Sequence, residues 1–475
     1  MDVLVVSTNR NSQPVSVMPV GACIVAEAAE QAGYRVRVLD LMYKRDPLRA
    51  LESEIDKSSP DVVGLSVRNI DDNNMQHPVT FFEDLAPLAY TIRERTKATI
   101  ILGGSAVAVM PEALLRHSGA SWAVLGNGEV AFPELLAALS RSNDPMRIPG
   151  VAWFENNVFM KNPVSLSPFS SGCLSPDFHR WVDVNAYLSR LSTVPIQSKR
   201  GCPFKCVYCT YAAGEGHTYR LYSPESIVDA ITALDRKGLR DIEFVDSIFN
   251  SPYAHAMAIC EGLARIRLDV RLQSLELNPM FIDDALLTTM EKAGFAGIGI
   301  TAESASDVVL EGLRKGFTSE HVYRAANYVR RHELPCFWIF MLGGPGETSE
   351  TVLETLGFAE RYIRPEDVAF FNIGIRIYPG TELENLARKE GTLTVPPDEM
   401  LSPVFYFSPS LSLSWLTEKL RNTMSRHLNF INTDSLGLSI LPTIQRLGYR
   451  FGVKQPLWRH TRYIRRGLRF LGSDV

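Results

Sequence analysis

Strand and helix patterns alternate in two separate blocks of this 475-residue chain, and this alternation restricts the folds that it can adopt. In the first block, strand patterns are separated by helical stretches at 19–33 and 79–96. The strand patterns cover residues 3–7, 34–40, 61–67, 99–104 and 121–126. The run at 61–67 is apolar on both faces, as in strands that are covered on both sides. The block therefore predicts a doubly wound, Rossmann-like parallel sheet, whose ligands bind beyond the carboxyl ends of the strands.

A second block begins near residue 193 and contains six further strand patterns with helices between them. These strand patterns cover residues 193–198, 241–246, 270–277, 297–303, 336–342 and 368–377. Six β/α units indicate a partial barrel of the TIM type, with functional residues at the carboxyl ends of its strands. We therefore predict an α/β protein with domains at 1–145 and 193–395. An ordered linker at 146–192 joins them, and a mostly helical region at 396–475 follows.

Three cysteines, Cys202, Cys206 and Cys209, lie in a C-x3-C-x2-C pattern just after the first strand of the second block. Thiolates this close in sequence can all reach one iron–sulfur cluster. Three protein ligands leave one iron of a four-iron cluster for a chelating small molecule. A zinc site is the alternative, but zinc favours four ligands, and the nearest candidate for a fourth is His217.

The residues around these cysteines favour a loop with positive charge. Gly201 and Pro203 interrupt any helix. Lys199, Arg200 and Lys205 favour thiolates and offset the negative charge of a cluster.

At this loop the chain resembles the radical S-adenosylmethionine (SAM) enzymes, in which C-x3-C-x2-C binds a [4Fe-4S] cluster. The resemblance implies that the free iron chelates the amino and carboxylate groups of SAM, and that Tyr208 lies near the adenine. It extends to four strand ends of the predicted barrel. The matching residues there are Asp246, Glu303, Ser304, Gly343, Gly344, Gly346 and Tyr378. A tight turn at the glycines and a charged rim residue at Glu303 are the structural alternatives.

Three strand ends of the first block resemble the cobalamin-binding domain that many radical SAM enzymes carry. The residues that carry this resemblance are Ser66, Arg68, Gly103, Gly104, Gly126, Gly128 and Glu129. The cobalamin-dependent mutases have a D-x-H-x-x-G motif whose histidine ligates cobalt, but the loop at 7–14 contains no histidine. The resemblance therefore implies bound cobalamin without a histidine ligand from this loop.

Arg68 ends a strand at the edge where the corrin is expected. A guanidinium has no lone pair to offer cobalt, but a fixed cation near the lower face can block that coordination site and favour the low-charge cobalt state. The alternative is a surface arginine that pairs with Asp71 or Asp72.

The composition excludes several classes of protein. With 49 basic and 53 acidic residues, the net charge of −4 does not indicate a nucleic-acid partner. The start of the chain reads as a strand rather than a signal peptide, and no run of 18 apolar residues predicts a transmembrane helix. Seven cysteines, three of them in one loop, favour a reducing cytoplasm. The other four are expected to be buried structural thiols: Cys23, Cys173, Cys260 and Cys336.

The stretch from Arg446 to Arg469 holds eight Lys or Arg residues with aromatic residues between them. Such a pattern is compatible with a basic surface for an anionic substrate, a carrier or a membrane. We favour a solvated helix whose aromatic side chains pack on the barrel.

Together these resemblances imply a cobalamin-dependent radical SAM methyltransferase that methylates a carbon of a small-molecule or peptide substrate by way of methylcobalamin. They also imply an electron donor such as flavodoxin or ferredoxin. The alternatives are a related enzyme that catalyses cyclisation, ring contraction or oxidation, and a non-catalytic cobalamin and iron–sulfur sensor. A methylthiotransferase is disfavoured, because residues 1–145 contain only Cys23 instead of three cluster cysteines.

Overall fold

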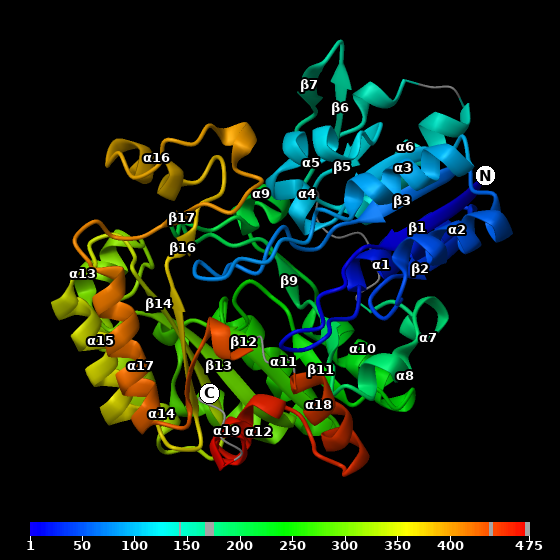
Figure 1. Cartoon of the computed structure of the whole chain (residues 1–475). Coiled ribbons are helices and arrows are strands. Elements are labelled where there is room, and N and C mark those ends of the chain that lie inside the picture. The colour runs from blue at the N-terminus through cyan, green and yellow to red at the C-terminus, as the bar shows by residue number, and fades with distance from the viewer. Residues whose placement is uncertain (142–143, 167–174, 437–439, 471–475) are drawn as a thin grey trace.

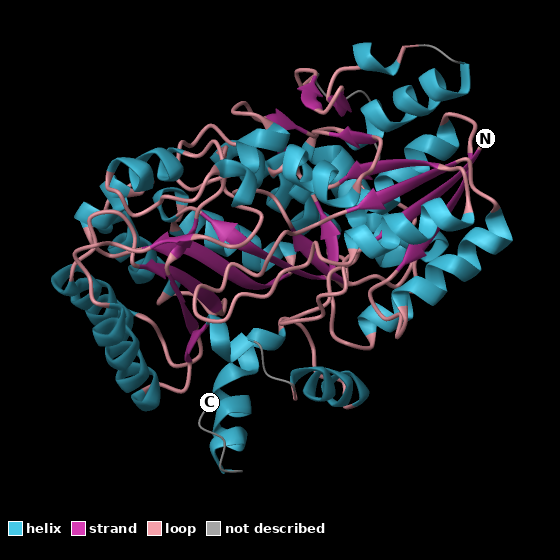
Figure 2. Ribbon diagram, turned by 45° about the horizontal axis from the view of Figure 1, so that its top comes forward, coloured by secondary structure: helices cyan, strands magenta, loops and turns pink. Residues whose placement is uncertain are grey.

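The computed structural model describes residues 1–141, 144–166, 175–436 and 440–470. These residues form two large sheets, one in each half of the chain (Figure 1). The strand order is β2-β1-β3-β4-β5-β6-β7 in the first and β18-β15-β14-β13-β12-β11-β8 in the second. Helices cover both sheets, and shorter strands and loops fill the space between them (Figure 2). Cys173 lies outside the described residues.

The N-terminal sheet has the predicted doubly wound order. Its parallel strands are β1 (Asp2–Ser7), β2 (Arg35–Asp40), β3 (Val62–Ser66), β4 (Thr99–Gly103) and β5 (Trp122–Val124). The helices are α1 (Val20–Gln31), α2 (Pro47–Ser58), α3 (Leu85–Arg95), α4 (Ser105–Val109), α5 (Pro111–Ser118) and α6 (Gly128–Arg141). The helix expected at 79–96 begins six residues late, because Thr80 instead pairs with Asp71 in an isolated bridge.

The segment expected to be a linker instead adds two strands to this sheet. β6 (Val151–Glu155) pairs antiparallel with β5, and β7 (Val158–Lys161) pairs antiparallel with β6. Asn156 and Asn157 join them with positive φ angles of 47° and 66°, the backbone that a tight hairpin needs. The short helices α7 (Phe178–Trp181) and α8 (Val184–Leu188) then lead to the second sheet.

The second sheet contains all six predicted strands in parallel order. They are β8 (Val194–Ile196), β11 (Asp241–Phe244), β12 (Arg271–Leu277), β13 (Phe295–Glu303), β14 (Cys336–Leu342) and β15 (Val368–Ile373). The helices that follow strands are α10 (Pro224–Arg236), α11 (Tyr253–Ile266), α12 (Asp284–Ala293), α13 (Asp307–Gly312), α14 (Ser319–Val329) and α15 (Ser349–Tyr362). The partial barrel is therefore confirmed.

The C-terminal region is less purely helical than expected. It contains α17 (Leu413–Arg426), α18 (Leu441–Arg450) and α19 (Thr461–Phe470), but β18 (Phe430–Asn432) also joins the barrel sheet beside β15. Trp458 packs at the starts of β13 and β14, with its ring centroid 5.5 Å from that of Phe337. This segment therefore covers the amino ends of the barrel strands, opposite the ends that carry the predicted site.

The loop after β3 joins the two halves of the molecule. Nε of Arg376, in β16 (Ile375–Arg376), lies 2.7 Å from Oδ2 of Asp71, and both side chains are almost fully buried. Nη2 of Arg376 also donates to the carbonyl of Met400 at 2.8 Å. Because a buried ion pair with further hydrogen bonds tolerates little movement, it fixes the first sheet against the barrel. In the described residues, no helix combines the length and apolar character needed to cross a membrane.

Candidate active site

The cysteine loop runs from β9 (Lys199–Arg200) to α9 (Tyr211–Glu215). Gly201 has a φ of 87°, and an added Cβ would collide with the carbonyl of Thr218, so glycine is required there. The amide of Cys202 donates to Gly216, and that of Val207 donates to Leu313 of the barrel, each at 3.1 Å. Backbone contacts thus hold both ends of the loop.

The three thiols lie within electrostatic reach of one another. Burial and the neighbouring Cys206 raise the pKa of Cys202, and they raise that of Cys209 to about 12. The ammonium of Lys315 lowers both. Grouped thiols with a nearby cation suit an anionic cluster.

The positive charge expected from the residues before the loop is largely balanced within the protein. Nζ of Lys199 lies 3.4 Å from Oδ2 of Asp246, and both side chains are fully buried. Nη1 of Arg200 lies 2.5 Å from Oε1 of Glu129. Lys315, which sequence reasoning missed, is a further buried cation beside the cysteines, and it pairs with Glu303.

Tyr208, Glu303 and Lys315 form a buried triad beside the cysteine loop. The hydroxyl of Tyr208 donates to Oε1 of Glu303 at 2.8 Å, and Nζ of Lys315 lies 3.1 Å from both oxygens. Burial opposes the charge of Lys315, but Glu303 holds the pKa of that ammonium well above its ordinary value. The triad brings two of the predicted residues, Tyr208 and Glu303, together.

Glu303 ends β13 with a φ of 61°, which is rare for a residue with a side chain. Its Oε2 is buried and has no hydrogen-bond partner among the described residues. Left-handed backbone and an unsatisfied carboxylate oxygen are typical of sites that bind a ligand. The only sequence signal for Lys315 was a lysine between apolar Leu313 and Phe317.

Asp246 contacts the protein itself. It is buried, and its carboxylate accepts from the amide of Ser198 at 2.7 Å and from the hydroxyl of the same residue at 2.6 Å. It therefore ties the end of β11 to the chain that enters the cysteine loop. This contact makes Asp246 a positioning residue.

The glycine turn after β14 was expected to offer its amides to a ligand, but Glu347 occupies them. The amides of Gly343 and Gly344 donate to Oε2 of Glu347 at 2.5 and 3.0 Å. Burial raises the pKa of Glu347 to about 7. Gly346 lies in the same turn beside Val308 of α13. The turn is therefore shaped by an internal carboxylate.

Ser304 and Tyr378 also contact other parts of the protein. Oγ of Ser304 lies 3.0 Å from Oγ1 of Thr355 on α15, and both atoms are buried. The hydroxyl of Tyr378 donates to Oδ1 of Asn73 at 3.1 Å, across the interface of the two sheets. Both side chains therefore bond to the protein, Ser304 to α15 and Tyr378 to the loop after β3.

On the N-terminal side, Ser66, Gly103 and Gly104 form the carboxyl edge of the sheet. The carbonyl of Ser66 accepts from the amide of Thr8 at 3.1 Å. Gly104 has a φ of 100°, and any side chain there would collide with the carbonyl of Val67. By contrast, a Cβ added to Gly103 would meet nothing within 4 Å. The edge therefore leaves open space at Gly103, as a bound cofactor requires.

Arg68 does not form the ion pair with Asp71 or Asp72 that the sequence left as an alternative. Asp71 pairs with Arg376, and Oδ1 of Asp72 accepts the amide of Asn74 at 3.1 Å. The side chain of Arg68 keeps accessible surface, yet burial lowers its pKa, while Tyr211 and Glu243 of the barrel half raise it. Arg68 therefore lies within electrostatic reach of the barrel half.

Tyr211 and Glu276 lie near Arg68 and the cysteine loop, and sequence reasoning missed both. Tyr211 is 46% exposed, but burial, Glu276 and Cys209 raise the pKa of its hydroxyl, while Arg68 lowers it. Burial and the nearby carboxylate of Glu303 raise the pKa of Glu276 to about 8. Residues of the cysteine loop, the carboxyl end of β12 and the end of β3 thus lie within electrostatic reach of one another.

Gly126, Gly128 and Glu129 connect the first domain to the cysteine loop. Gly126 lies against Val164, and Gly128 lies against Val25 of α1. Glu129 and Asn127 both accept from Nη1 of Arg200, at 2.5 and 3.1 Å. This motif therefore acts through the arginine that precedes Cys202.

The residues fit the groups that the resemblance implied. Soft thiolates suit iron, the open space at Gly103 suits a planar ring, and the free oxygen of Glu303 suits a donor on SAM. Among the described residues, no three His, Cys, Asp or Glu side chains converge on a single metal ion, whereas a four-iron cluster holds its ligands further apart.

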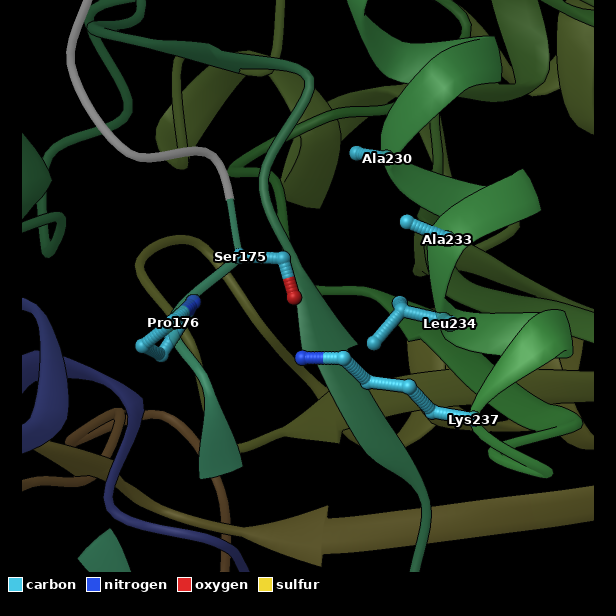
Figure 3. A pocket seen from close by; sticks show the side chains of 6 residues that line it. All are labelled: Ser175, Pro176, Ala230, Ala233, Leu234 and Lys237. Atoms are coloured by element: carbon cyan, nitrogen blue, oxygen red, sulfur yellow. The ribbon is translucent and has the colours of Figure 1, made fainter. Parts of the chain in front are cut away.

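A surface hollow elsewhere carries none of this chemistry. It has a volume of about 160 Å³ and lies between α10 and residues 175–176 (Figure 3). Nζ of Lys237, at its rim, lies 3.1 Å from Oδ1 of Asp177. No residue of the cysteine loop or of the strand ends lines it.

Family models match both halves of the chain. The radical SAM superfamily matches residues 196–359, and the B12 binding domain matches residues 9–136. This chain belongs to the cobalamin-binding radical SAM enzymes. Its cofactors are a [4Fe-4S] cluster, SAM and cobalamin. The predicted fold class and the three cofactors are therefore confirmed.

Relatives of this radical SAM enzyme cover most of its length. The tryptophan 2-C-methyltransferase of Streptomyces laurentii is 26% identical over 442 residues, covering 79% of this chain and 73% of that protein. An uncharacterised methyltransferase of Pyrococcus horikoshii is 27% identical over 377 residues, 77% of each chain. The solved methyltransferase TsrM of Kitasatospora setae, with cobalamin and a [4Fe-4S] cluster bound, superposes with a TM-score of 0.85 at 25% identity, over 99% of each chain.

Proposed function

We propose that this enzyme is a cobalamin-dependent radical SAM methyltransferase that places a methyl group on a carbon of a small molecule. The observation that carries the proposal is the bond from Arg200 to Glu129, which holds the cysteine loop against the cobalamin-binding domain. Relatives over most of the chain are named methyltransferases, which supports the same activity. A shared space between the two domains suits a reaction in which two cofactors act on one substrate.

The residues of the chain divide into holding and positioning groups. Cys202, Cys206 and Cys209 would hold the cluster, and the space at Gly103 would receive cobalamin. The triad orients Glu303, whose Oε2 would accept a hydrogen bond from a donor on SAM. When bound, these cofactors supply cleavage of SAM and transfer of its methyl group.

Buried ion pairs hold the residues beside the cysteine loop and the interface of the two halves. Tyr208 and Lys315 are fixed by Glu303, and Arg376 closes the interface through Asp71. Tyr211, Glu276 and Arg68 remain as polar groups that can contact a substrate. The substrate is therefore expected to carry polar groups that match them.

Relatives act on chemically different small molecules, according to their names. They include methyltransferases for tryptophan and for cytidylyl-2-hydroxyethylphosphonate, and a hopanoid C-3 methylase. We propose that the substrate is a small organic molecule. A peptide-derived substrate is the next candidate. The reductant proposed for the cluster is a flavodoxin or ferredoxin.

Anaerobic reconstitution with iron, sulfide and cobalamin tests the proposal. Incubation with SAM, a reductant and a library of small metabolites should give a product that is heavier by one methylene group, together with S-adenosylhomocysteine. Release of 5′-deoxyadenosine as well indicates radical chemistry, and its absence indicates polar transfer.

Matched cysteine variants make this test specific. Alanine at Cys202, Cys206 and Cys209 should abolish cluster binding and turnover, whereas Cys260→Ala, a buried thiol of α11, should retain both. Cluster retention by the triple variant would overturn the site assignment.

A non-methylating reaction is the second candidate. The anaerobic magnesium-protoporphyrin IX monomethyl ester cyclase of Rubrivivax gelatinosus is 28% identical, but over 164 residues, 34% of this chain. A product whose mass changes without a gain of one methylene group would favour this candidate over methyl transfer.

A further inference from the structure

The basic stretch at the C-terminal end of the described chain has no role in the site above. Residues 435–470 contain no Asp or Glu, while eight Lys or Arg residues lie between Arg446 and Arg469. Aromatic side chains were expected to pack on the barrel, but only Trp458 does so. Tyr449, Phe451, Tyr463 and Phe470 are exposed instead.

One side of each C-terminal helix is anchored to the protein. Nη1 of Arg465 donates to the carbonyl of Phe430 on β18, and Nη1 of Arg469 donates to that of Ser425 at 2.8 Å. Nε2 of Gln445, on α18, donates to the carbonyl of Pro14 at 2.6 Å. These contacts fix which side of each helix faces outward.

The outward side of α19 carries Tyr463, Arg466 and Phe470, which share one face because they are three and four residues apart. Phe470 is 91% exposed and Tyr463 is 67% exposed. Exposed apolar side chains that gather on one helix face, unlike single ones, mark a surface that contacts something.

The end of α18 repeats this composition with Leu447, Arg450 and Phe451, followed by Lys454. Phe451 is 79% exposed. Arg450, Lys454 and Arg466 form no ion pair within the part of the chain that the structure describes. Figure 1 places α18 and α19 at the lower edge of the molecule, below the barrel.

We infer that these two helix faces form a docking surface for an anionic lipid bilayer. The surface, called here the C-terminal basic face, consists of Leu447, Tyr449, Arg450, Phe451, Lys454, Tyr463, Arg466 and Phe470. Aromatic rings that insert at the headgroup level, with arginines beside them to meet anionic headgroups, are the pattern of interfacial helices.

Two observations favour lipid over an acidic protein partner. The rings of Phe451 and Phe470 stand free on helix ends, so a soft surface can receive them without a preformed pocket. Trp458 also places the segment between α18 and α19 at the amino ends of the barrel strands, opposite the cysteine loop. An electron donor docked here would lie on the wrong side of the barrel to reach the cluster.

Vesicle co-sedimentation of the full chain, reconstituted with its cofactors, tests the inference. The protein should bind phosphatidylcholine vesicles that contain phosphatidylglycerol at least tenfold more tightly than phosphatidylcholine alone. Binding should fall when the salt concentration is raised from about 0.1 M to about 1 M, because the screening length shortens from about 10 Å to about 3 Å.

Two variants separate charge from insertion. R450Q with R466Q should weaken binding to anionic vesicles by about fivefold for each arginine replaced. F451S with F470S should weaken binding to both kinds of vesicle. Iron content and turnover of SAM should stay at the native level in both, because none of these residues contacts the site.

Matched controls use exposed residues elsewhere. Tyr90→Ser replaces a ring that is 61% exposed, and Arg324→Gln replaces an exposed arginine of α14. Both should bind vesicles as the native chain does. Absence of preference for anionic vesicles, or unchanged binding by R450Q/R466Q, would overturn the inference. Capture of an acidic protein by this face without vesicle binding would overturn it as well.

Discussion

Nη1 of Arg200 lies 2.5 Å from Oε1 of Glu129, so an arginine two residues before the first cluster cysteine is bonded to the first turn of α6. Their side chains are only 10% and 18% exposed. The same nitrogen lies 3.1 Å from Oδ1 of Asn127. The cobalamin-binding domain therefore helps to set the position of the cysteine loop in the other domain.

Glu129→Gln should weaken this connection. Loss of one charge from a mostly buried pair should lower the free energy of unfolding by about 2 kcal/mol, measured as a lower Tm. Methyl transfer should fall more than retention of SAM, because the two domains no longer hold a fixed distance. Glu52→Gln, which breaks the exposed pair with Arg95, is the control and should change neither.

Lys315→Met should destabilise the site by leaving the carboxylate of Glu303 buried without its cation. The expected loss is about 3–5 kcal/mol in the free energy of unfolding, with weaker retention of SAM in equilibrium dialysis. The double variant E303Q/K315M should recover most of the stability but not the SAM binding. Lys292→Met, on the exposed face of α12, is the control. A double variant no more stable than K315M would contradict the pairing.

Glu347 should make stability depend on pH. Burial raises its pKa from 4.5 to about 7, so the folded protein holds a proton that the unfolded chain releases between these values. Its contribution is therefore greatest below pH 4.5 and is lost as the pH rises to about 7, by roughly 3 kcal/mol.

Glu347→Gln removes this titration. The Tm of the variant relative to the native protein should therefore rise across the same pH interval. Glu354→Gln, on the exposed side of α15, is the control. A constant Tm difference between pH 4.5 and 7 would exclude the assignment.

Arg68 is predicted to tune the cobalt centre. If its guanidinium lies near the lower face of cobalamin, Arg68→Ala should shift the cobalt reduction potential, and Arg68→Lys should restore part of it because it keeps the positive charge. Spectroelectrochemistry of the reconstituted protein measures both. Arg49→Ala, which replaces an exposed arginine of α2, is the control. An unchanged cobalt reduction potential in Arg68→Ala would contradict the prediction.

Much of the fold was predictable because its signals are local. Apolar runs of strand length placed β1 to β5 and the six barrel strands close to their observed bounds. β6 and β7 escaped because their pairing depends on β5, a partner that does not appear in their own sequence. β18 was hidden for the same reason, since it is three residues long and pairs only with β15.

The candidate site likewise combines a local sequence pattern with contacts between residues that are distant in sequence. The spacing of Cys202, Cys206 and Cys209 by itself determined that one loop gathers three thiols, because residues so close in sequence remain close in any fold. Only the tertiary structure decided that Lys315 is a buried cation beside them, that Glu347 occupies the glycine amides, and that Arg200 reaches Glu129. These contacts join residues from separate elements, and burial in a shared interior sets their strength.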